Sequence, residues 1–186
     1  MKEPNRPAYP EKSPSGDPHN FTDELASTLS EQFPAASISV GCGSLQPSLD
    51  HLAQSYFHAR SAAAFAASGS SSSRKNSASF DELGFYRILL SVSDHEVLRA
   101  YADELLSPAE NYEKKHQGDY LITLEEYLLC NGSIQAAAAH LYCHRNTVNK
   151  RIRTLREELS YNLDDPQVCF ELNAAFAIRH FLKLFP

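Results

Sequence analysis

The chain has 186 residues, of which 42% are hydrophobic and 22% charged, enough for one ordinary domain or two small ones with a buried core. The net charge of −6 does not indicate a polyanion-binding protein, and no run of about 18 apolar residues is present to form a membrane-spanning helix. The charge is segregated, however. Residues 131–156 carry five basic side chains and no acidic one, while the other 12 basic and 23 acidic residues leave the remainder at −11.

The N-terminal segment, 1–20, contains five prolines and no branched aliphatic side chain. Such a segment cannot contribute to a core, and we expect residues 1–20 to be a disordered tail. The tail also lacks the apolar stretch of a secretion signal, so we expect a cytoplasmic protein. The four cysteines occur without a C-x-x-C pair and are expected to be reduced thiols.

Residues 21–84 mix helical and strand patterns, which predicts a small α+β segment. Leu25, Leu29 and Phe33 recur every four residues, as on one face of a helix, whereas Ile38 and Val40 alternate with serines, as in a strand. The patterns predict a helix over 21–33, a strand over 36–43, a helix over 47–67, a serine-rich loop over 68–77, and a short edge strand with a turn over 78–84.

From residue 85 onward, every segment has a helical pattern. Asp94 and Asp165 are suited to cap helices, and Pro166 suits a first helical position. The patterns predict helices over 85–92, 94–106, 119–130, 133–141, 145–159 and 165–184, with a turn or short helix over 108–115. The fold is therefore expected to be mainly α.

A short alanine-rich helix followed after three residues by a basic helix is the layout of a helix-turn-helix. At about 100° per residue, Val148, Ile152, Leu155 and Leu159 fall on one narrow apolar stripe of the second helix. The opposite arc carries amides and cations, which suit base edges and phosphates in a DNA major groove. Members of this arc are Asn146, Asn149, Lys150 and Arg153.

Arg145, Asn146 and Thr147 stand at the start of that helix, where the helix dipole favours a phosphate and Thr147 can donate its hydroxyl. A solvated basic face on an ordinary bundle helix is the alternative interpretation. The joint presence of a Gly-Ser break, a short alanine-rich helix, a tight turn and a segment free of acidic side chains over 131–156 favours DNA binding.

Several strings together resemble the C-terminal helix-turn-helix domain of PucR/CdaR-type bacterial transcriptional regulators. The match runs over about residues 117–182, and its most specific part is His144-Arg145-Asn146-Thr147 followed by Arg151. The helix pair is also similar to that of the DNA-bending protein called factor for inversion stimulation. The resemblance implies that His144 and Arg145 approach bases, that Thr147, Asn149 and Lys150 approach bases or backbone, and that Arg151 belongs to the same DNA-binding set.

The upstream part is similar to the second half of the GGDEF-like domain of that family, on residues 38–43 and 80–84. The resemblance implies a truncated α+β, half GGDEF-like segment over 21–84, connector helices over 85–116 and a helix-turn-helix bundle over 117–186. The first half of the GGDEF-like domain and a sensory domain are expected to be missing, so the chain is interpreted as a C-terminal remnant or fragment.

The sequence supports a metal site or an enzyme active site only weakly. Cys130, His140, Cys143 and His144 match no standard zinc spacing and are expected to be packing or turn residues, so no metal and no cofactor are expected. No Gly-Gly-Asp/Glu-Glu-Phe string is present, and a cyclase or phosphodiesterase remnant would rest on fold analogy alone. We expect no enzyme activity.

The expected function is sequence-specific binding of double-stranded DNA, with the helix over about 145–159 in the major groove. One short helix contacts only a few base pairs, so a homodimer on two half-sites is expected, formed through residues 21–116. The alternative is a protein-interaction module that pairs with a full-length relative and modulates it. No effector is indicated.

Overall fold

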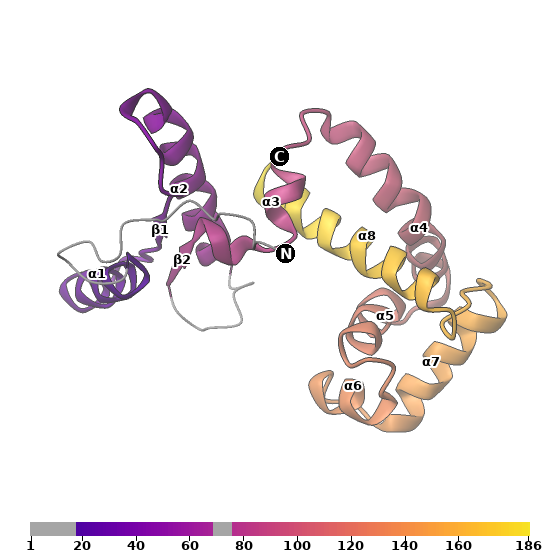
Figure 1. The fold of residues 1–186 in the computed structure, drawn as a ribbon. Coiled ribbons are helices and arrows are strands. Elements are labelled where there is room, and N and C mark those ends of the chain that lie inside the picture. The colour runs from indigo at the N-terminus through magenta and orange to yellow at the C-terminus, as the bar shows by residue number, and fades with distance from the viewer. Residues whose placement is uncertain (1–17, 69–75) are drawn as a thin grey trace, which may run out of the picture. The chain divides into compact units, whose positions relative to one another are not determined.

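A computed structural model describes residues 18–68 and 76–186, which form two compact units divided after Ile88 (Figure 1). The mainly helical fold predicted from the sequence is confirmed. Most of the predicted tail over 1–20 and of the predicted loop over 68–77 lies outside the described residues. One correction applies to the tail: helix α1, Pro18–Gln32, already includes its last three residues.

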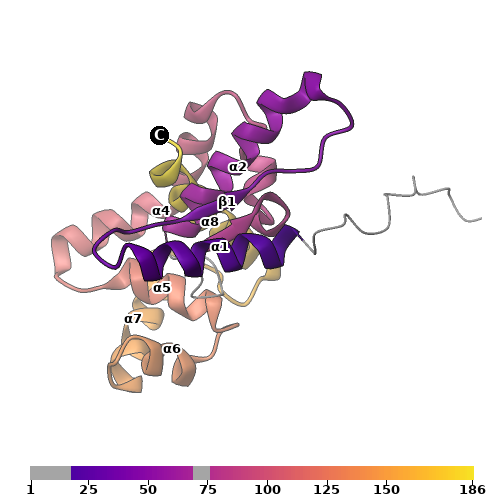
Figure 2. The same ribbon diagram turned by 90° about the vertical axis from the view of Figure 1, so that its left-hand side faces the viewer.

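The N-terminal unit is built on two short parallel strands, β1 (Val40–Cys42) and β2 (Ser77–Ser79), which pair Val40 with Ser77. Parallel strands need a crossover, and helix α2 (Leu52–Ala67), which begins with a 3-10 turn, supplies it. Helix α1 packs along the strands (Figure 2), and a 3-10 turn (Phe80–Leu83) and α3 (Tyr86–Leu89) follow β2. The predicted strands are confirmed in place but are shorter than expected.

Strand β1 and helix α2 approach each other closely because Gly41 has no side chain. A Cβ at Gly41 would lie 2.0 Å from the carbonyl oxygen of Ala59 and 2.3 Å from the backbone nitrogen of Ala63. Backbone atoms cannot move aside as a flexible side chain does, so the strand and the helix can pack at this distance only with glycine.

The N-terminal unit leaves many large apolar side chains in solvent. On α2 the buried residues are Ser61, Ala62 and Ala66, whereas the apolar residues at its start face outward. The large apolar side chains of this unit that are at least 49% exposed are Phe21, Phe33, Leu45, Leu49, Leu52, Tyr56, Phe57 and Ile88. Exposed apolar side chains in this number are typical of surfaces that another protein segment covers.

The C-terminal unit is a helical bundle. Its helices are α4 (His95–His116), α5 (Tyr120–Leu129), α6 (Ile134–His140), α7 (Arg145–Glu157) and α8 (Pro166–Leu184). Helices α4 and α8 pack against each other, and α5, α6 and α7 form a three-helix group beside them (Figure 1). In the described part of the chain, no helix combines the length and apolarity needed to cross a lipid bilayer.

Two predicted helix boundaries in this unit need correction. The predicted break at Pro108 is absent, since α4 continues through it. Proline removes one backbone hydrogen bond, but the buried face formed by Leu98, Ala102, Leu106 and Ala109 holds the helix together across that position. Helix α7 ends at Glu157, so Leu159 lies beyond the helix and is only half-buried.

The predicted caps at Asp94 and Asp165 are confirmed. The Asp94 carboxylate accepts a hydrogen bond from the backbone of Glu96 at 3.0 Å, and that of Asp165 accepts one from Gln167 at 2.8 Å. The predicted stop before α6 is confirmed as well, because Gly132 has a φ of 80° and Ser133 caps the new helix.

Replacing Gly41 with alanine is expected to lower the free energy of unfolding by about 1–3 kcal/mol, because the added methyl group forces β1 away from α2. Urea denaturation followed by circular dichroism measures the change. Gln54→Ala, at an exposed position on α2, is the control and should stay within about 0.5 kcal/mol of the wild type. Equal stability of the two variants would show that the strand and helix pack less closely than described.

Tyr161, in the segment after α7, donates a hydrogen bond to the carbonyl oxygen of Leu105 in α4 at 2.6 Å. Tyr161→Phe should lower the free energy of unfolding, measured by urea denaturation, by about 1 kcal/mol. Tyr142→Phe, at an exposed side chain, is the control and should leave that free energy unchanged. Burial raises the pKa of the Tyr161 phenol, so the folded state retains a proton that the unfolded state loses at high pH. Wild-type stability should therefore fall as the pH rises past about 10, and less in Tyr161→Phe.

Candidate nucleic-acid interface

Helix α7 buries one narrow stripe. Val148, Ile152 and Leu155 are at most 3% exposed, and they pack against α5 and α6. Their spacing of four and three residues places them on one side of the helix, as the sequence predicted. The rotation of α7 is therefore fixed by apolar contacts, and the residues opposite this stripe must face solvent.

Seven of the eight predicted DNA-binding residues are exposed. They are His144, Arg145, Asn146, Thr147, Asn149, Lys150 and Arg153. Within residues 18–68 and 76–186, no hydrogen bond or ion pair involves the side chains of Arg145, Asn146, Thr147, Asn149 or Lys150. These side chains, which we call the bare arc, present two amides, a hydroxyl and two cations.

Two members of the predicted set have limited contacts of their own. The Nδ1 atom of His144 accepts a hydrogen bond from the backbone nitrogen of Asn146 at 3.2 Å, so His144 caps α7. Arg153 lies 3.7 Å from Glu157, and both side chains are about two-thirds exposed. An exposed pair of this kind is weak, so Arg153 remains available to another anion.

Small residues let α6 pack closely beneath α7. Ala137 and Ala138 are buried at the α6–α7 contact, whereas Ile134 and Leu141 are only half-buried. The connection runs from Leu141 to His144, and Tyr142 within it adopts a left-handed conformation with a φ of 51°. The turn is therefore tight enough to keep the two helices in contact.

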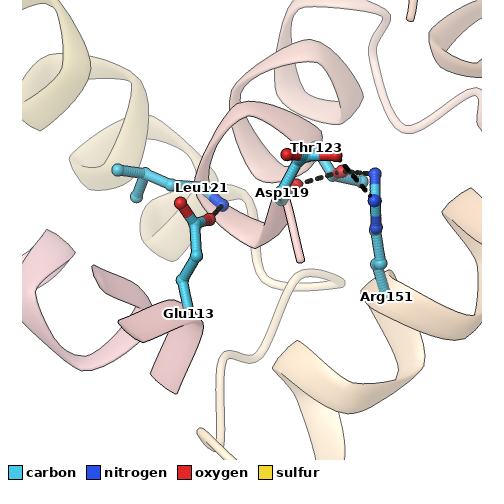
Figure 3. A network of polar contacts seen from close by, with 5 residues as sticks. All are labelled: Glu113, Asp119, Leu121, Thr123 and Arg151. Atoms are coloured by element: carbon cyan, nitrogen blue, oxygen red, sulfur yellow. Dashed lines mark hydrogen bonds and ion pairs between the residues drawn. The ribbon is translucent and has the colours of Figure 1, made fainter. Parts of the chain in front are cut away.

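Arg151 differs from the other predicted residues because α5 holds its guanidinium group. One nitrogen donates to the carboxylate of Asp119 at 2.7 Å, and another donates to the hydroxyl of Thr123 at 3.1 Å (Figure 3). The Arg151 side chain is 18% exposed, and Thr123 is fully buried. The structure thus places Arg151 in a contact between α5 and α7 and not on the bare arc.

The same end of α5 also receives a carboxylate from α4. Glu113 accepts a hydrogen bond from the backbone nitrogen of Leu121 at 3.0 Å (Figure 3). Asp119 stands at the capping position of α5 but its carboxylate does not cap the helix, since it binds Arg151 instead. Helices α4, α5 and α7 therefore meet in one polar network at the start of α5.

A second arginine of α7 is also bound within the molecule. Arg156 donates two hydrogen bonds to the carboxylate of Asp164, at 2.8 and 2.9 Å, and one to the hydroxyl of Tyr127 at 3.2 Å. Burial opposes the charge of Arg156, but the hydrogen bonds outweigh it and raise its pKa above the usual value. Of the five basic residues in 131–156, only Arg145, Lys150 and Arg153 are exposed.

The intramolecular roles of Asp119, Thr123 and Asp164 were not predicted from the sequence. Helix geometry nevertheless contained a signal that Arg151 and Arg156 contact other parts of the protein. Arg151 directly precedes Ile152 and Arg156 directly follows Leu155, so the two arginines lie at opposite borders of the buried stripe. Arginines at such borders reach neighbouring helices, whereas Lys150, two residues from both Val148 and Ile152, points away from them.

The structure also brings together three groups that could bind a metal ion. Glu126 lies on α5 and Cys130 is the C-cap residue of that helix. Both lie beside His140 of α6. Burial, followed by the charge of Glu126, raises the pKa of the Cys130 thiol. Two of the residues weighed for zinc in the sequence, Cys143 and His144, do not belong to this group.

Comparison with known families gives two matches. Residues 120–178 match the PucR C-terminal helix-turn-helix domain, which includes α5, α6 and α7. Residues 7–65 match a GGDEF-like domain, a range that begins and ends earlier than the segment 21–84 predicted for it. No solved structure matches the chain.

Two curated relatives come from Bacillus subtilis strain 168. The DNA-binding transcriptional activator AdeR is 24% identical over 167 residues, 90% of this chain and 39% of AdeR. The proline-responsive transcriptional activator PutR is 34% identical over 86 residues, 46% of this chain and 21% of PutR. The chain thus spans well under half the length of either relative. The predicted resemblance to the PucR family is confirmed, because residues 120–178 match its C-terminal helix-turn-helix domain and residues 7–65 match a GGDEF-like domain.

Proposed function

We propose that the chain is a transcriptional regulator whose C-terminal unit binds double-stranded DNA with α7 in the major groove. The single observation that carries this proposal is the bare arc, whose polar side chains are exposed on a helix that buries one narrow apolar stripe. Exposed amides and cations on one helix are complementary to base edges and phosphates. The relatives AdeR and PutR, both named as transcriptional activators, support the same assignment.

Each side chain of the bare arc has a role suited to its chemistry. The amides of Asn146 and Asn149 can pair with adenine through two hydrogen bonds, and Arg145 can pair with guanine. Thr147 and Lys150 suit phosphate oxygens, because a hydroxyl donates one hydrogen bond and an ammonium group acts as a point charge.

Three further residues complete the assignment. His144 caps α7 through Nδ1, which leaves its other ring nitrogen to approach a base, and Arg153 can exchange Glu157 for a base or phosphate. Arg151 acts as a positioning residue, because its guanidinium group is bound to Asp119 and Thr123.

Binding of an operator is proposed to require two copies of the chain. A single helix reads only a few base pairs, and dimers of helix-turn-helix proteins place two such helices on adjacent turns of DNA. The exposed apolar side chains of the N-terminal unit, among them Leu49, Leu52 and Tyr56, are suited to such an interface. The same observation favours a second candidate function, a module that pairs with a longer relative. Loss of DNA affinity in the isolated chain, with retained pairing, would favour this second function.

The base-reading role of Arg145 is tested on a site obtained by selecting bound sequences from random duplexes. Arg145→Ala should weaken binding to that site by about 1–3 kcal/mol, the scale of one base contact, and should relax the preference for its base pair. Fluorescence anisotropy measures both effects. Lys183→Ala, which removes an exposed cation from α8, is the control and should leave affinity unchanged. Equal affinities of the wild type, Arg145→Ala and Lys183→Ala for the selected site would contradict the proposed placement of α7.

The phosphate-binding role of Lys150 has a different signature. Lys150→Ala should weaken binding to all duplexes alike and should reduce the slope of log affinity against log salt by about 1, since one fewer counterion is released. Binding titrations at several salt concentrations measure the slope. A selective loss on one sequence would assign Lys150 to base recognition instead.

If Arg151 positions α7, replacing it should lower stability without changing the slope of log DNA affinity against log salt. Arg151→Ala should lower the free energy of unfolding by about 1.5–3 kcal/mol, because the variant loses charge-assisted hydrogen bonds and leaves the Thr123 hydroxyl without this donor. Lys150→Ala should leave stability within about 0.5 kcal/mol of the wild type. In a double variant that also carries Asp119→Ala, the losses of unfolding free energy from the two substitutions should not add, because each substitution removes the same contact. A reduced salt slope in Arg151→Ala would show that Arg151 contacts a phosphate.

A further inference from the structure

A second polar group lies where α5 joins α6. Glu126 and Cys130 are four residues apart, so they share one side of α5 and its C-cap, and His140 is the last residue of α6. The potential ligand atoms of all three lie within 4.8 Å of one another. Other groups of this kind are absent from residues 18–68 and 76–186.

The distances in this group are close to those of a tetrahedral metal site. The Nδ1 atom of His140 lies 3.7 Å from the Cys130 sulfur and 3.1 Å from a carboxylate oxygen of Glu126. With metal–ligand bonds of about 2.0–2.3 Å, tetrahedral geometry places a nitrogen about 3.6 Å from a sulfur and about 3.4 Å from an oxygen. These two distances are therefore within a few tenths of an ångström of the tetrahedral values, and the third pair, Glu126 and Cys130, has its ligand atoms within 4.8 Å.

The Glu126 carboxylate and the Cys130 sulfur both face the same ring nitrogen of His140, Nδ1, at 3.1 and 3.7 Å. A metal ion would accept electron pairs from all three atoms at once. The His140 side chain is 63% exposed and that of Glu126 is 26% exposed, so an ion can enter from solvent and keep a water ligand.

We propose that Glu126, Cys130 and His140 bind a Zn²⁺ ion, which ties α6 to α5. Zinc fits this mixed set, because it accepts thiolate, imidazole and carboxylate ligands in tetrahedral geometry. Binding releases the thiol proton to solvent and forms a Zn–S bond, with no change of oxidation state. Such a zinc bridge would hold α6, the first helix of the helix-turn-helix, against α5.

The full chain, reduced with a phosphine and freed of metal, is titrated with Co²⁺, which reports thiolate ligation through its near-ultraviolet charge-transfer band. The wild type should bind one equivalent and give this band, and Zn²⁺ should displace it. Cys130→Ser should abolish the band, and His140→Gln should weaken binding by more than the roughly tenfold that even an outer-shell change costs. Circular dichroism verifies that both variants retain their helices.

Matched controls separate this site from nonspecific ligation. Cys143→Ser and His51→Gln remove a cysteine and a histidine outside the group, and both should bind Co²⁺ as the wild type does. The proposal is overturned if the wild type gives no thiolate band, if Cys130→Ser retains it, or if Cys143→Ser loses it. The first outcome would leave an ordinary contact between His140 and Glu126.

A measurement on the unaltered protein keeps the test independent of variant folding. Zn²⁺ should protect Cys130 from alkylation by iodoacetamide, as read by mass spectrometry of peptides, and should leave Cys42, Cys143 and Cys169 as reactive as before. Equal protection of the four thiols, or protection of none, would contradict the site. The readout needs no DNA, so failure of this proposal and failure of the proposed DNA binding are distinguishable.

Discussion

The start of α5 is the point on which the geometry of the C-terminal unit depends. Glu113 of α4 caps this helix end, and Asp119 and Thr123 of α5 hold Arg151 of α7 (Figure 3). The buried stripe on α7 sets the rotation of that helix, while the polar contacts set its position along α5. Hydrogen bonds have directional preferences that apolar contacts lack, and the combination defines a single arrangement of the three helices.

The basic segment of the chain is divided by this arrangement. Arg151 and Arg156 lie at the two borders of the buried stripe and bind carboxylates of the protein itself, whereas Arg145 and Lys150 remain without partners in the described part of the chain. Net charge alone therefore overstates the cationic surface of α7. The division also separates two kinds of arginine that look alike in the sequence, those that support the helix and those that extend from it.

Local signals predicted much of the fold. The caps Asp94 and Asp165, the stop at Gly132 and the apolar stripe of α7 depend on residues close together in the sequence, and these predictions are confirmed. The continuation of α4 through Pro108 was missed because it depends on packing against α8, far away in the chain. The contacts of Arg151 and the approach of His140 to Glu126 were missed for the same reason. Among the exposed members of the predicted DNA-binding set, Asn146, Asn149, Lys150 and Arg153 follow from helical periodicity, which needs no knowledge of the partner helix. The other three, His144, Arg145 and Thr147, were predicted from the start of the helix and from the family resemblance.

The parallel pairing of β1 with β2 has a consequence for the order in which the chain folds. The strands can join only after the whole segment between Cys42 and Ser77 has been closed into a loop, at a cost in chain entropy. Helices α5, α6 and α7 are consecutive in sequence and need only short closures. These three helices should therefore assemble early, before α8 has returned to α4 and before the sheet has formed.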